Sequence, residues 1–197
     1  EVGEAMGSAW IDKSDTLFVD RALALQVPYD RPDAPLATTT ISTAHEAGWT
    51  WDIGLPDRRG TGYVYSSRHT TDDRAEQILR GYVGQAGEGL TPRLLKLKVG
   101  HRQAHWIKNC VAVGLSGGFL EPLESTGIVL IEAAAYMLAR NLPRRGGMEA
   151  AARQFNAAMT DRYLRAIDFI KLHYCLSQRT DNRFWTDNAD PASIPET

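Results

Sequence analysis

The chain has 197 residues, enough for a domain with a substantial hydrophobic core. Hydrophobic residues make up 43% of it and charged residues 23%, which is ordinary for a globular protein in water. The 22 basic and 24 acidic side chains leave a formal charge of -2. This balance gives no electrostatic footprint for nucleic acid and no basic stripe for a membrane surface, so neither is expected as a partner.

The cysteine count and the apolar runs indicate the setting of the protein. Two cysteines, Cys110 and Cys175, are too few for a disulfide framework or a cysteine-rich metal site, and buried thiols are expected. There is no signal peptide, and no apolar run approaches the roughly 20 residues of a membrane span. We therefore expect a reducing, cytoplasmic protein. The chain starts at Glu1 and not at Met, as a piece of a longer protein would.

Alternating apolar residues predict strands in the first part of the chain. Leu23, Leu25 and Val27 alternate with smaller or polar neighbours up to Pro28. Further strands are expected at residues 37–44, 48–55 and 62–67, because these are rich in threonine and aromatic residues, with a turn at residues 56–60 between the last two. A fifth strand is predicted by the alternation of Leu95, Leu97 and Val99 with lysines. We predict a mostly antiparallel sheet with a wide face lined by aromatic residues.

Helical spacing appears three times. Thr71 offers an N-cap for a helix that carries Ala75, Ile78, Leu79 and Tyr82. A second helix is expected after residues 125–127, and a third over about residues 149–176. The tail from Arg179 is polar and is expected to be a loop. The predicted buried stripes of the second and third helices are Ile128, Ile131, Ala135 and Leu138, and Phe155, Met159, Arg162, Ala166, Ile170 and Tyr174.

The Gly/Ser-rich residues 114–127 lead into the second helix. The first turn of a helix has unpaired N–H groups and a partial positive charge, so Thr126 and Gly127 could hold an anion or the electron-rich edge of a cofactor. Glu121 and Glu124 precede this site, and a carboxylate there could accept a proton or stabilise a developing cation. The alternative is an ordinary capped helix in which Glu124 favours the dipole.

Other candidate residues have weaker patterns. Trp49 and Trp51 share a strand face and could form a stacking wall for a flat ring, or simply pack in the core between sheet and helix. Arg58 and Arg59 are expected at a solvated turn. His101 and His105 have a helical metal-ligand spacing, but no HExxH motif is present and their surroundings predict strand, so no metal site is expected. The chain contains neither GxGxxG after a strand nor GxxxxGK[ST] nor GxSxG.

Several segments resemble the flavin-dependent tryptophan halogenases. Residues 114–127, GLSGGFLEPLESTG, are similar to the flavin-proximal segment of that family. Residues 49–54, WTWDIG, resemble its WxWxIP motif, with Gly54 in place of proline, and residues 60–67, GTGYVYSS, resemble the strand that follows. Asp20-Arg21-Ala22 and Phe184-Trp185 also fit, so the resemblance covers nearly the whole chain.

The resemblance implies a mechanism and assigns residues to it. Reduced FAD from a separate flavin reductase would activate oxygen, and a chloride or bromide ion would be oxidised to hypohalous acid. This acid would travel through a tunnel to a lysine and halogenate an aromatic substrate such as tryptophan. Catalytic roles fall to Glu124 and Ser125, halide binding to Thr126 and Gly127, and gating to Trp49 and Trp51. The residues implied for cofactor binding are Gly114, Leu115, Ser116, Gly117, Phe119, Pro122, Gly127 and Ile128.

The resemblance also implies an incomplete enzyme. The family's GxGxxG loop and its delivering lysine belong to an N-terminal portion that this chain lacks. We therefore expect one α+β fragment of a hydroxybenzoate-hydroxylase-like fold. Its expected parts are a mainly sheet region facing substrate and flavin (residues 1–108), the flavin- and halide-proximal loop and helix (109–143) and a long helix (148–177). The fragment is expected to be inactive alone. The alternatives are a flavin-dependent aromatic hydroxylase of the same fold and a non-catalytic fragment.

Overall fold

The computed structural model describes residues 2–31, 33–143 and 146–195. Its contacts divide the chain into two compact units. Unit 1 comprises Glu1–Leu17, Lys98–Leu176 and Ala192–Thr197, and unit 2 comprises Phe18–Leu97 and Ser177–Pro191.

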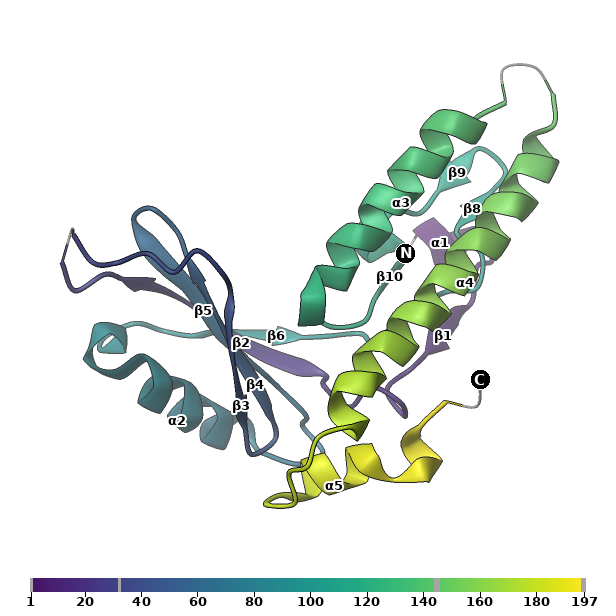
Figure 1. Ribbon diagram of the computed structural model, residues 1–197. Coiled ribbons are helices and arrows are strands. Elements are labelled where there is room, and N and C mark those ends of the chain that lie inside the picture. Colours follow the sequence, from purple (N-terminus) through teal and green to yellow (C-terminus); the bar gives the residue numbers. More distant parts are fainter. Residues whose placement is uncertain (1, 32, 144–145, 196–197) are drawn as a thin grey trace. The chain divides into compact units, whose positions relative to one another are not determined.

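Unit 2 is built on a five-stranded antiparallel sheet with the order β3-β4-β5-β2-β6 (Figure 1). The strands are β2 (Arg21–Pro28), β3 (Ile41–His45), β4 (Gly48–Gly54), β5 (Arg58–Tyr65) and β6 (Arg93–Lys96). The strand expected from residue 37 begins only at Ile41. The turn expected over residues 56–60 is also too long, because the Leu55 N–H already donates to the Arg58 carbonyl at 2.8 Å and Arg58 pairs with Pro28.

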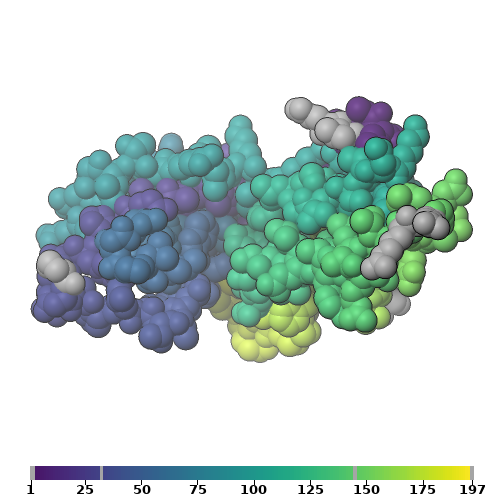
Figure 2. Space-filling view, turned by 90° about the horizontal axis from the view of Figure 1, so that it is seen from above, coloured from purple at the N-terminus to yellow at the C-terminus, as the bar shows by residue number. Residues whose placement is uncertain are grey.

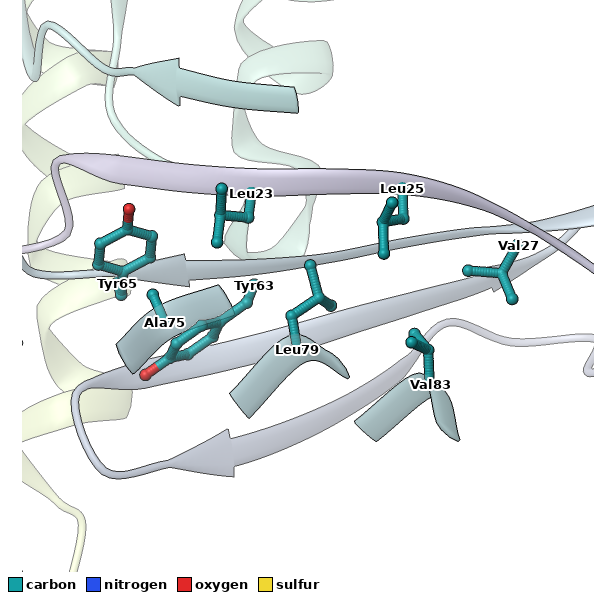
Figure 3. Close-up of a cluster of buried hydrophobic side chains, with 8 residues drawn as sticks. All are labelled: Leu23, Leu25, Val27, Tyr63, Tyr65, Ala75, Leu79 and Val83. Carbon is teal, nitrogen blue, oxygen red and sulfur yellow. The ribbon is translucent and has the colours of Figure 1, made fainter. Parts of the chain in front are cut away.

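Helix α2 (Asp72–Val83) covers one face of this sheet and confirms the expected helix. The Thr71 hydroxyl accepts from the Arg74 N–H at 3.2 Å, which satisfies one free amide of the first turn. A short 3-10 helix, η1 (Gly84–Gly87), follows and begins at Gly84, whose φ is 63°. Side chains from β2, β5 and α2 fill the interface (Figure 3). They are Leu23, Leu25, Val27, Tyr63, Tyr65, Ala75, Leu79 and Val83.

The sheet's aromatic residues divide between its two faces. Trp51 lies opposite Gly62 and Trp49 opposite Val64, whereas Thr50 lies opposite Tyr63. Because side chains alternate along a strand, the tryptophans share the face opposite to the one that carries the tyrosines and α2. The expectation of one wide aromatic face is therefore wrong.

The C-terminal tail contains a helix that the sequence analysis missed. Helix α5 (Arg183–Ala189) begins at Asn182, whose side chain accepts from the Phe184 N–H at 3.0 Å. Phe184 and Trp185 are buried, and the Trp185 indole donates to the His45 carbonyl at 2.8 Å. A 3-10 helix, η4 (Pro191–Ser193), follows.

Unit 1 combines small sheets with two long helices. Strands β1 (Trp10–Asp12), β7 (Gly100–Arg102) and β10 (Gly118–Phe119) form an antiparallel sheet in the order β1-β7-β10. A short helix α1 (Val2–Ala5) precedes it, and β8 (Trp106–Ile107) and β9 (Cys110–Val111) form a hairpin. The Asn156 side chain accepts from two hairpin N–H groups, of His105 and Trp106, and so fastens the hairpin to α4 (Met148–Cys175).

Helix α3 (Thr126–Asn141) packs beside α4 (Figure 1). Both helices were expected. The buried stripe predicted for α3 is wrong, whereas Phe155, Met159, Ile170 and Tyr174 of the stripe predicted for α4 are buried. Ile128 is 60% exposed and Ile131 is also exposed, and α3 lies at the surface in the space-filling view (Figure 2). On α4, Tyr163 and Ile167 are buried where Arg162 and Ala166 were expected. The observed buried stripes are Thr126, Leu130, Ala134 and Met137, and Phe155, Met159, Tyr163, Ile167, Ile170, Lys171 and Tyr174.

The described ranges thus form a mixed fold in which every strand pair is antiparallel, and the expected α+β class is confirmed. No helix within these ranges is long and apolar enough to cross a bilayer.

Candidate functional site

The Gly/Ser-rich segment of unit 1 folds into a tight turn beside a cavity. Residues Gly114–Ser116 form a 3-10 helix, η2, in which Gly114 has a φ of 63°. The Ser116 hydroxyl donates to the Val113 carbonyl at 2.8 Å, and Leu115 is 78% exposed. Leu115 and Ser116 line a cavity of about 470 Å³ together with the buried side chains of Arg102 and His105.

Two consecutive residues ahead of α3 have left-handed backbones. Glu124 and Ser125, at the end of the 3-10 helix η3 (Leu123–Ser125), both have a φ of 54°. This region costs a residue with a side chain about 1–2 kcal/mol. Ser125 occupies the N-cap position of α3 but makes no side-chain cap bond, and both side chains are exposed. The ordinary capped helix, which was the alternative, is not what forms here.

The first residues of α3 leave polar groups available. The Thr126 N–H donates to the Leu123 carbonyl, but the buried Thr126 hydroxyl has no hydrogen-bond partner. Nothing lies within 4 Å of the position that a Cβ on Gly127 would occupy, so a ligand can approach this backbone closely. A buried hydroxyl at the positive end of a 16-residue helix is suited to an anion.

Glu121 lies apart from this opening although it is only three residues from Glu124. Its side chain is 1% exposed, and one carboxylate oxygen accepts from the Tyr174 hydroxyl at 2.8 Å. Lys171, one turn earlier on α4, is also 1% exposed. Burial lowers the pKa of Lys171 to about 8, and the negative charges of Cys175 and Glu121 oppose this shift. The carboxylate of Glu121 is therefore buried, whereas that of Glu124 is exposed to solvent.

Unit 1 also buries two histidines that sequence reasoning set aside. The rings of His101 and His105 stack on Tyr163, with centroids 4.8 and 5.0 Å from it. Burial lowers the pKa of both imidazoles, that of His105 to about 4. Within the described ranges, no group of three or more His, Cys, Asp or Glu side chains could hold a metal ion. The two rings are neutral core groups at neutral pH.

The tryptophan pair belongs to unit 2. The Trp49 and Trp51 rings are 6.5 Å apart with an interplanar angle of 67°. They do not pack between the sheet and α2, because that interface is filled from the opposite face. At Gly54, where the WxWxIP motif has proline, a Cβ would lie 2.8 Å from the Ala37 carbonyl oxygen.

Arg59, expected at a solvated turn, lies in β5. Its guanidinium is 3.4 Å from the carboxylate of Asp52, which is buried on β4. The sequence analysis placed Arg59 in a turn because the nearby Pro56 and Asp57 are typical turn residues, and so it did not predict this ion pair.

Comparison with known proteins decides the family. A sequence model for tryptophan halogenase matches residues 1–197. The chain belongs to the tryptophan halogenase family. Among curated members of this family, it is 38% identical to the 7-chloro-L-tryptophan 6-halogenase KtzR of Kutzneria sp. over 186 residues, which is 94% of this chain and 36% of KtzR.

Solved structures of halogenases share the fold. A tryptophan halogenase from Shewanella frigidimarina is 44% identical with a TM-score of 0.94, over 99% of this chain and 38% of that protein. The flavin-dependent halogenase BrvH from Brevundimonas sp. is 41% identical with a TM-score of 0.90, over 98% of this chain and 39% of BrvH. The chain thus spans little more than a third of these relatives.

Sequence reasoning found the opening at Thr126 and Gly127 but missed the residues behind it. Lys171 and Tyr174 sit 50 and 53 residues from Glu121 along the chain. The one available signal was the helical spacing of Ile167, Ile170 and Tyr174, which places Lys171 next to the buried stripe of α4.

Proposed function

We propose that this chain forms part of an FAD-dependent halogenase that uses FADH2, O2 and chloride or bromide to halogenate tryptophan or a related aromatic compound. The observation that carries this proposal is the uncapped start of α3, where the buried Thr126 hydroxyl and the open Gly127 follow the exposed carboxylate of Glu124. Membership of the tryptophan halogenase family supports it.

The halide and the acid–base step have separate places in this proposal. Thr126 and Gly127 bind the halide, because a hydroxyl donor and the helix dipole both favour an anion. The Glu124 carboxylate stabilises the positive charge that develops on the aromatic ring and accepts the proton the ring loses. Ser125 lies beside it on the path of the oxidant, and Trp49 and Trp51 keep the substrate away from the flavin.

The residues next to α3 fit a flavin. Leu115 and Ile128 are exposed apolar side chains that can contact a flat ring system, and Gly127 allows close approach to the backbone. Gly114, with its φ of 63°, gives the preceding turn its shape. The remaining cofactor-binding residues in this proposal are Ser116, Gly117, Phe119 and Pro122. When bound, FADH2 would supply the two electrons that reduce O2, and a separate flavin reductase, in the reducing cytoplasm, would regenerate FADH2 from FAD.

The test of function is a product assay on a protein of full family length that carries this segment. Glu124→Gln should reduce halogenated product by about 10²- to 10⁴-fold, the usual contribution of an acid–base group. Glu132→Gln, an exposed carboxylate on the same helix, is the matched control and should leave the rate unchanged. Equal rates for the two variants would contradict the role of Glu124.

Two further measurements separate the rival functions. An aromatic hydroxylase would form hydroxylated product at an undiminished rate without halide, whereas a halogenase requires bromide or chloride. A flavin titration of the 197-residue chain tests the prediction that this chain alone is an inactive fragment. We expect weak FAD binding and no halogenation by this chain alone, because it holds no phosphate-binding GxGxxG loop. Tight stoichiometric binding, or robust bromination of an indole, would contradict it.

A further inference from the structure

We propose that Glu121, Tyr174 and Lys171 form a buried clasp that holds the Glu124–Ser125 turn in its left-handed conformation, which makes Glu121 and Tyr174 positioning residues for the halide site. This inference rests on the proposed function only where it names a halide. Its structural part, the origin of the turn's backbone geometry, stands independently.

The clasp joins the start of the turn to α4. The Tyr174 hydroxyl donates to a Glu121 carboxylate oxygen at 2.8 Å, and Lys171 lies three residues before Tyr174 on the same helix. Residues three apart on a helix share a face, and the negative charge of Glu121 also acts on the buried Lys171 ammonium. A buried carboxylate is stable only when it is hydrogen-bonded and paired, so this set of contacts fixes where Glu121 can lie.

Side-chain hydrogen bonds and ion pairs among the described residues do not impose the geometry of the turn. Its backbone bonds are from the Ser125 N–H to the Pro122 carbonyl at 3.1 Å and from the Thr126 N–H to the Leu123 carbonyl. The side chains of Glu124 and Ser125 make no hydrogen bond or ion pair with any described residue, and both are exposed. Unfavourable backbone conformations persist only where the surroundings over-determine them.

The surroundings act through the two ends of this short segment. One end is Glu121, which the clasp holds to α4. Pro122 follows it, and the proline ring fixes its own φ at -73°. The other end is Thr126, which is buried as the first residue of α3. With both ends fixed, the residues between them have little freedom, and the left-handed pair is the conformation that closes the gap. Releasing Glu121 should therefore relax Glu124 and Ser125.

The experiment uses the 197-residue chain labelled for NMR. Tyr174→Phe removes the hydroxyl and keeps the ring, and Glu121→Gln removes the charge. Tyr163→Phe is the matched control, because Tyr163 and Tyr174 are buried to 3% and 4% exposure on the same helix and only Tyr174 bonds Glu121. The readouts are the amide–Hα NOE and Cα and Cβ shifts of Glu124 and Ser125, which mark positive φ, together with the thermal unfolding temperature.

We expect Tyr174→Phe and Glu121→Gln to remove the positive-φ signature at Glu124 and Ser125, whereas Tyr163→Phe lowers the unfolding temperature without changing that signature. If both clasp variants keep the signature, the clasp is only a core contact and the proposal is wrong. If Glu121→Gln does not fold, Tyr174→Phe decides the question, since its ring packing is retained.

A bromide titration of the Gly127 amide separates this inference from the proposed function. In the unaltered chain the amide should shift with bromide, and in Tyr174→Phe the affinity should fall about three- to tenfold, the size expected for one hydrogen bond. If the unaltered chain does not respond, the halide site fails while the backbone signatures still test the clasp. An unchanged affinity together with a lost signature would refute the link between them.

Discussion

Gly62 is the position where a single methyl group tests the tryptophan face of the sheet most sharply. A Cβ at this residue would lie 2.1 Å from the Trp51 ring and 2.5 Å from the Leu23 carbonyl oxygen. The indole could swing away, but the carbonyl belongs to the neighbouring strand and cannot move without breaking its pairing. We therefore expect Gly62→Ala to displace Trp51 and to strain β2 against β5.

The loss of folding free energy in Gly62→Ala can be estimated from the cost of overpacking. Forcing an extra carbon into a well-packed site costs about 1–3 kcal/mol, and the fixed carbonyl places Gly62→Ala at about 2–3 kcal/mol. Gly60→Ala is the matched control in the same strand and on the same face, because a Cβ there would meet only the Leu55 side chain, at 4.0 Å. Replacing this glycine should stabilise the fold by about 0.4–1 kcal/mol, since alanine restricts the unfolded chain.

The assay is thermal and urea unfolding of the two variants beside the unaltered chain, followed by tryptophan fluorescence. For a chain of this size 1 kcal/mol corresponds to about 2–4 °C, so the two alanine variants should differ by about 5–16 °C in unfolding temperature. Gly62→Ala should also change the fluorescence of the folded state, and Gly60→Ala should not. Equal unfolding temperatures for the two variants would refute the close contact between Gly62 and Trp51.

Three pH-dependent outcomes complete the predictions. The Tyr65 hydroxyl, and then Arg21, hold the pKa of Asp72 below its usual value, so stability is lost as pH falls below about 4, and Asp72→Asn should remove that part of a melting-temperature profile against pH. NMR should show His105 titrating near pH 4; a midpoint at 6.5 would contradict its burial. Because folding lowers the pKa of Lys171 from 10.5 to about 8, stability should rise with pH between these values, and Lys171→Met should abolish that rise.

Local patterns in the sequence predicted several elements well. Thr71 and the spacing of Ala75 and Leu79 located α2, because a capping hydroxyl and one narrow apolar stripe leave little ambiguity. The stripe of α3 was misplaced because residues 128–131 are all apolar, so no single face stands out. Helix α5 was missed because its seven residues are mostly polar and only Phe184 and Trp185 are large and apolar.

The sequence predicted less of the candidate site than of the secondary structure. The glycines and the resemblance of residues 114–127 to a known family located the start of α3, but no local rule predicts left-handed backbone at a glutamate and a serine. The contact between Glu121 and Tyr174 joins residues 53 positions apart, and sequence periodicity carries no information about such a pair. Residue types alone therefore identify the groups at the site but not the backbone that presents them.

The conflict between local preference and observed structure is itself informative at Ser125. Serine is among the best N-cap residues, and a capping bond is worth about 1 kcal/mol, yet Ser125 stands at the N-cap of α3 without making one. The helix thus forgoes its cap, keeps an unpartnered Thr126 hydroxyl and holds two residues in left-handed backbone. Departures of this kind concentrate at functional sites, where a ligand completes what the fold leaves open. At the positive end of a helix, the ligand that we propose is an anion.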